Sequence, residues 1–174
     1  MKKLTPLVLL SFLLASCNFK SEKFITTKKY SGEAKLKNIY VIVADDKDTK
    51  EWLTDYKNAF MDSLKSYQID VEGISYCCDN KKPELKDALN VALSSSKKFQ
   101  NILMVSVFKT NTGYSTAVTR YLHLELYDIG KSKKVWNSTV ATTLNWFTSG
   151  QDLKDAAERL SYTTLAEMKN KAIL

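Results

Sequence analysis

The stretch Tyr121-Leu122-His123-Leu124-Glu125-Leu126-Tyr127-Asp128 decides how this chain folds. Leucine alternates with tyrosine, histidine and glutamate, and this period of two residues predicts a β-strand with one buried face and one more polar face. The turn-forming residues 128–131 follow, and a second strand-like segment runs from Val135 to about Leu144. The sequence therefore predicts an antiparallel β-hairpin at this point.

Strands of a different kind precede the hairpin. Residues 39–43 (Ile-Tyr-Val-Ile-Val) are a continuous apolar run, and residues 102–108 are the most apolar stretch after the N-terminal signal; both are typical of central strands covered on both faces. A shorter β-type segment over residues 71–78 lies between them. Together with the hairpin, these segments predict a sheet of about five strands.

Amphipathic segments connect the early strands and close the chain. Asp48 and Glu51 have the spacing of a capping box, which predicts the start of a helix. Apolar residues at steps of three and four predict helices over residues 52–67, 85–93 and 153–172. The order is therefore strand, helix, strand, helix, strand, strand, strand, helix.

This order of elements predicts how the strands pair. Helices between the early strands force crossovers and favour parallel pairing, whereas late strands that are joined by turns must pair antiparallel. The predicted fold class is α/β (mixed α+β), with a single mixed sheet and helices packed on it.

The N-terminus has the pattern of an export signal. Residues 1–14 form a basic start and an apolar run, which is too short for a membrane-spanning helix of about 20 residues. The small residues Ala15 and Ser16 then precede Cys17. This pattern resembles a bacterial lipoprotein signal, and the resemblance implies that signal peptide 1–16 is removed and that Cys17 is acylated.

The residues after Cys17 extend this prediction. The residue after Cys17 is Asn18 and not aspartate, so the resemblance implies that, in a two-membrane bacterium, the protein is transferred to the outer membrane. Fatty chains such as palmitate would hold it there. Residues 17–37 are polar and rich in lysine, so they are predicted to be a flexible tether. Residues 38–174 have a length that suits a single domain with its own core.

The charged residues argue against one class of partner. Without Lys2 and Lys3 of the signal, 24 basic and 19 acidic residues remain, a net charge of +5. Arg120 and Arg159 are the only arginines, although guanidinium groups are what bidentate phosphate and guanine recognition needs. We therefore expect no nucleic-acid partner.

Cys77 and Cys78 are adjacent, and two hypotheses stay open for them. In the first, one thiol packs in the core and the other lies nearer solvent at a strand end. In the second, they form a vicinal disulfide or a soft-metal pair, because an exported chain meets oxidants. No CxxC spacing and no nearby histidine supports a zinc site.

Catalytic signatures are missing from the sequence. It contains no HExxH, GxSxG or GxGxxG motif and no phosphate-binding loop, and His123 is the single histidine. We therefore expect no enzymatic activity and no cofactor. The alternative is a divalent-metal binder or metal-dependent enzyme that uses Asp45, Asp46 and Asp79, because these carboxylates follow strands whose carboxyl ends would share one edge of the sheet.

The hairpin also resembles a known group of proteins. The strand that ends in Asp128, the turn through Gly130-Lys131 and the return through Val135-Trp136 are similar to a hairpin of many small envelope lipoproteins. With the lipoprotein signal and the order of elements, the chain resembles the group whose fold is like the TolB N-terminal domain. That group includes lipoprotein activators of cell-wall synthases and the curli secretion lipoprotein. The resemblance implies a non-enzymatic module that binds or assembles with another envelope protein.

Four side chains of the hairpin are candidates for such an interface. Three of them, Tyr121, Tyr127 and Trp136, are of types that are common in interface hot spots. The fourth, His123, lies among the tyrosines of the same strand. The alternative is that a helix covers them.

Overall fold

The computed structural model describes residues 23–28, 30–32, 35–45, 50–77, 99–112, 117–145 and 150–174, together with Asn90 and Ser94. The strands are β1 (Lys23–Lys28), β2 (Asn38–Asp45), β3 (Asp70–Cys77), β4 (Asn101–Thr112), β5 (Ala117–Asp128) and β6 (Lys133–Asn145), and the helices are α2 (Lys50–Ser66) and α4 (Gly150–Asn170).

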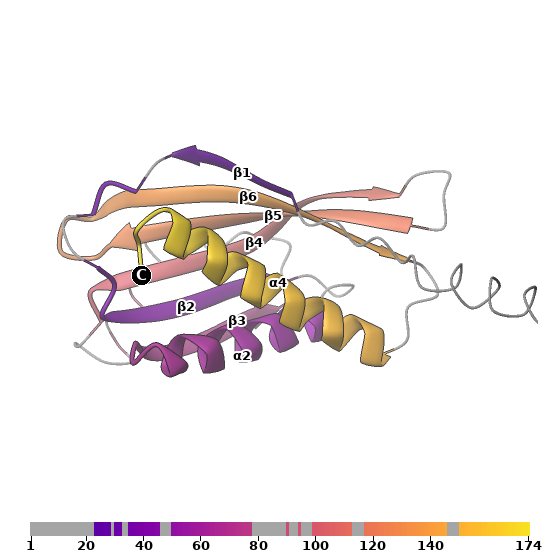
Figure 1. Cartoon of the computed structure of the whole chain (residues 1–174), viewed down its shortest axis with the longest axis horizontal. Helices are drawn as coiled ribbons and strands as arrows, with labels where there is room; N and C mark the ends of the chain where they lie inside the picture. The colour runs from indigo at the N-terminus through magenta and orange to yellow at the C-terminus, as the bar shows by residue number, and fades with distance from the viewer. Residues whose placement is uncertain are drawn as a thin grey trace, which may run out of the picture.

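The strands form one mixed sheet in the order β1-β6-β5-β4-β2-β3 (Figure 1). β2 pairs in parallel with both β3 and β4. The pairs β4–β5, β5–β6 and β1–β6 are antiparallel. The predicted fold class, with parallel early strands and antiparallel late strands, is confirmed.

The two described helices lie side by side on one face of the sheet, which we call the helix face (Figure 1). The leucines of β5 point toward this face, since Leu122, Leu124 and Leu126 are fully buried in the same cluster as the helix residues. Tyr56 of α2 and Thr164 of α4 join the helices through a buried hydrogen bond of 3.3 Å. The predicted buried face of the strand is therefore confirmed, although Glu125 and Tyr127 on the opposite face are also buried.

The opposite side of the sheet, the second face, carries a smaller apolar cluster. Its buried members are Tyr40, Ile42, Phe99, Ile102, Met104 and Tyr127. Tyr40 and Phe99 meet edge to face with ring centroids 5.4 Å apart. Both faces of the central strands are therefore buried here, as the continuous apolar runs predicted.

The structure corrects the predicted tether. The sequence predicted a flexible segment over residues 17–37, but Lys23–Lys28 is an edge strand that pairs with β6. Phe24 packs against the main core, and the Leu36 N–H donates to the Ile173 carbonyl over 2.9 Å. Phe24 and Leu36 of this segment thus contribute to the main core, so the folded domain begins well before residue 38.

The predicted helix over residues 85–93 lies largely outside the described residues. Asn90, within this range, and Ser94, one residue beyond it, are described, and both are helical. Cys77 ends β3, while Cys78 also lies outside the described residues, so the two hypotheses for this cysteine pair stay open.

Both described helices end in the same motif, and neither uses glycine. Gln68 and Ala172 adopt the left-handed conformation, with φ of 61° and 57°. After α2, the Ile69 N–H donates to the Leu64 carbonyl over 3.2 Å, and after α4 the Ile173 N–H donates to the Met168 carbonyl over 2.9 Å. These are Schellman caps, which are normally completed by a glycine.

Gly73 marks a close approach between α2 and the sheet. A Cβ atom at this position would lie 2.6 Å from the Val41 carbonyl oxygen and 3.1 Å from the Met61 sulfur. The backbone cannot move away from such a contact, so only glycine fits at this position.

Neither α2 nor α4, the two helices with described bounds, has the length and apolar character of a transmembrane helix.

Candidate interaction surface

The polar side of β5 lies on the second face of the sheet. Because Leu122, Leu124 and Leu126 point toward the helices, the residues between them point the opposite way. The predicted interface residues Tyr121, His123 and Tyr127 therefore share a face that neither α2 nor α4 covers.

Phe108 joins Tyr121 and His123 in a group that we call the aromatic patch. The Phe108 ring stacks on His123 with centroids 4.2 Å apart and lies 6.0 Å from the Tyr121 ring. Phe108 is 50% exposed, while Tyr121 and His123 are partly exposed. The single histidine thus serves as a stacking partner in a partly solvent-exposed aromatic group.

A β-bulge positions the aromatic patch. The pairing of β4 with β5 runs regularly up to Val107 opposite Leu122, then shifts so that Lys109 lies opposite Tyr121. Phe108 is the extra residue at this bulge, and bulges turn side chains outward and increase local twist. Phe108 was not among the predicted interface residues, because the apolar run over residues 102–108 predicted a strand buried on both faces. The spacing of two from Met104 and Ser106 could have shown that Phe108 shares their face.

A buried carboxylate lies next to the aromatic patch on the same face. Glu125 is only 7% exposed, and its Oε1 atom is 2.7 Å from the Lys134 ammonium. The Lys134 nitrogen is also 5.9 Å from the centroid of the Tyr127 ring. Burial, followed by the negative charge of Glu125 and a hydrogen bond to it, raises the pKa of Tyr127 to about 12. The phenol therefore stays protonated at physiological pH and donates to the carboxylate.

Two of the predicted interface residues are not available for contact. Tyr127 is 9% exposed and belongs to the buried cluster of the second face. Trp136 is fully buried and lies on the helix face, because it pairs with Leu126, and directly paired residues share a face. The structure therefore does not bring Trp136 together with the other three predicted residues.

The predicted metal cluster lies mostly outside the described residues. Asp46 and Asp79 are not described, and Asp45 is the last residue of β2. β2 and β3 are parallel and end together, with Asp45 opposite Cys77. Among the described residues, no group of three or more His, Cys, Asp or Glu side chains is placed to hold a metal ion. Cys17, the predicted lipidation site, also lies outside the described residues.

Comparison with known proteins gives a fold but no family. No protein-family model and no curated protein matches the sequence. Among solved structures, the PelC dodecamer from Paraburkholderia phytofirmans is similar, with a TM-score of 0.56 and 20% identity over 84% of this chain and 96% of that one. Lipoprotein GNA1162 from Neisseria meningitidis matches with a TM-score of 0.45 and 15% identity over 76% of this chain and 98% of that one. The chain thus shares its mixed α/β fold with the PelC structure.

Proposed function

We propose that this chain is a lipid-anchored protein of the bacterial cell envelope and that its α/β domain binds another envelope protein without catalysing a reaction. In this proposal, acylated Cys17 holds the domain at the membrane and the aromatic patch makes the contact. The observation that carries the proposal is the exposed Phe108 ring stacked on His123.

The aromatic patch has the properties of an interface anchor. Large aromatic side chains contribute most of the binding energy in many interfaces, particularly when their geometry is fixed in advance. Here all three rings are carried by paired strands, so little side-chain and backbone freedom remains to be lost on binding. Covering the half-exposed Phe108 ring with a partner would also remove apolar surface from water, which favours binding.

The absence of catalytic motifs from the sequence supports a binding function. The single histidine is stacked on Phe108, and Glu125 is paired with Lys134. The PelC structures are dodecamers, so a protein with a similar fold can self-assemble. A second copy of this chain is therefore a partner that the experiment must distinguish from a different protein.

The contact is tested with Phe108→Ala and Tyr121→Ala, combined in the full-length chain. Cells that make the native or the substituted protein are cross-linked, and proteins attached to it are identified and quantified. We expect the double variant to lose the partner by more than about 30-fold, which corresponds to a hot spot of about 2 kcal/mol. Sedimentation of the purified protein separates self-assembly from binding of a different protein.

Tyr162→Ala is the matched control. Tyr162 is 65% exposed on α4, so its removal also deletes a large exposed aromatic side chain, but on the helix side of the domain. Tyr162→Ala is expected to keep the partner at the native level. Equal recovery from the double variant and the native protein would show that the aromatic patch does not bind the partner.

The anchor is tested separately. Mass spectrometry of the native protein is expected to show a mature chain that begins at Cys17 and carries fatty acyl groups. A mature chain that keeps its leader, or that begins elsewhere without acyl groups, would contradict this part of the proposal.

A further inference from the structure

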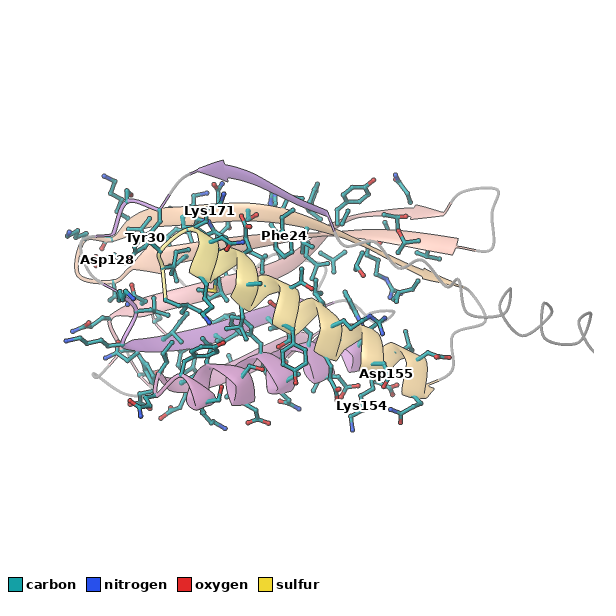
Figure 2. The ribbon with its side chains drawn as sticks, in the orientation of Figure 1. Phe24, Tyr30, Asp128, Lys154, Asp155 and Lys171 are labelled. Carbon is teal, nitrogen blue, oxygen red and sulfur yellow. The ribbon has the colours of Figure 1, made fainter. Side chains whose placement is uncertain are left out.

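The two ends of the sheet differ in which segments meet there. At one end, which we call the turn end, lie the β5–β6 turn, Leu36 and the C-terminal Ile173, because the Ser31 N–H donates to the Val135 carbonyl and Leu36 donates to Ile173. At the opposite end, the helix-start end, β2 and β6 finish and α2 and α4 begin. In Figure 2, Tyr30 and Asp128 mark the turn end, while Lys154 and Asp155 mark the helix-start end.

The chain enters the sheet near the helix-start end. β1 is antiparallel to β6, with Lys23 opposite Ala141 and Lys28 opposite Asn137. β6 starts at Lys133, next to the turn, so Lys23 lies on the side of β1 that is remote from the turn. The first described residue of β1 therefore lies nearer the helix-start end than the turn end.

The segment between Cys17 and Lys23 is short compared with the sheet. Six residue steps separate Cys17 from Lys23, so a fully extended chain covers at most about 20 Å. The eight steps along β6 from Ala141 back to Lys133 cover about 26 Å, and the turn lies farther still. A lipid on Cys17 therefore cannot hold the domain with its turn end on the membrane and its helix-start end pointing away.

The antiparallel strands project farthest at the helix-start end. The last pair between β2 and β4 is Ala44 with Ser106, yet β4 continues for six more residues to Thr112, or about 20 Å (Figure 1). Lys23 pairs with Ala141, Ala141 with Tyr121, and Tyr121 with Lys109, so the start of β1 is level with the base of this projection.

We propose that the helix-start end, led by the projecting strands β4 and β5, rests on the lipid headgroups of the membrane that carries the anchor. This proposal rests on the proposed acylation of Cys17. The turn end, with the C-terminus, then points away from the membrane. Phe108 lies four residues before the end of β4, so the aromatic patch is about 13 Å from the tip of the described strand. Its partner is accordingly a protein that is held at the same membrane.

Energy transfer to the membrane tests this orientation. The native acylated protein is reconstituted in vesicles of phosphatidylethanolamine and phosphatidylglycerol that contain an acceptor-labelled lipid. A donor dye is attached through an azide-bearing amino acid at Asn111 or at Lys133, which are both exposed and lie near opposite ends of the sheet. We expect severalfold more efficient transfer from position 111 than from position 133.

The outcomes separate the orientation from the anchor. Mass spectrometry of the same sample shows whether Cys17 is acylated. If it is acylated and transfer is equal at the two positions, or larger at position 133, the orientation is overturned and the anchor stands. If the protein is not acylated and shows no transfer, the anchoring fails and the orientation fails with it.

Discussion

The two faces of strand β5 differ in how much of their side chains is buried. On the helix face of β5, Leu122, Leu124 and Leu126 are fully buried beneath α2 and α4. On the second face, Tyr121 and His123 remain partly exposed and hold the half-exposed ring of Phe108. The difference indicates that stability resides mainly on the helix face, while the second face carries the surface that we propose for binding. Substitutions on the two faces should therefore change different measurements.

The largest effect is expected on the helix face. Trp136→Ala removes a fully buried indole, and large-to-small substitutions of this kind cost about 4 kcal/mol because they leave a cavity. Chemical denaturation should show this loss of stability. Tyr121→Ala, on the second face, should cost about 1 kcal/mol or less, since the side chain is partly exposed. Equal losses of unfolding free energy for the two variants would show that side chains on both faces contribute equally to stability.

A smaller effect is expected at the buried carboxylate of the second face. Lys134→Met removes the ammonium that lies 2.7 Å from Glu125, whose side chain is 10% exposed. Leaving this carboxylate without its cation should cost about 2 kcal/mol, which is below the value for a fully buried pair because Lys134 is partly exposed. The control is Lys65→Met, which breaks the exposed pair with Asp62 and should cost less than about 0.5 kcal/mol. Similar costs would mean that water screens both pairs alike.

Alkaline pH should reveal the phenol that donates to this carboxylate. The pKa of Tyr127 is raised to about 12 in the folded protein, whereas an unfolded tyrosine ionises near pH 10. The folded state thus holds this proton more tightly, and its contribution to stability is complete below about pH 10 and is lost as the pH rises toward 12. Tyr127→Phe should flatten this part of the stability profile. Phenolate absorbance should show one fewer tyrosine that titrates late; an unchanged titration would contradict the hydrogen bond.

The sequence predicted the helix face better than the second face. The alternating leucines of β5 required one buried side, and the crossover helices required parallel early strands, so the core and the sheet followed from periodicity. Trp136 was predicted to be an interface residue because of its side-chain type, with cover by a helix as the alternative, and its burial in the main core favours the alternative. Its strand partner, Leu126, decides its face, and a register shift just after Leu126 has no signature in the sequence.

Two other features depend on contacts that a single sequence does not reveal. β1 is a short edge strand whose residues are mostly lysine and threonine. Phe24 packs against the main core, and its position there depends on the pairing of β1 with β6. The bulge that exposes Phe108 is a local insertion in the pairing of β4 with β5, so the apolar run in the sequence predicted burial instead. Long-range pairing therefore decides both features.

The smallest effect should come from the ends of the two helices that cover the helix face. Gln68 and Ala172 have positive φ in Schellman caps, where glycine avoids the steric cost of a Cβ atom. Gln68→Gly and Ala172→Gly should each raise the free energy of unfolding by about 0.5–1 kcal/mol, because glycine removes the steric cost of the Cβ atom. The conformational entropy that glycine adds to the unfolded chain reduces this gain. Binding of the partner to the aromatic patch should not change, because neither residue lies on the second face. A gain in stability that also altered binding would show that the two faces are energetically coupled.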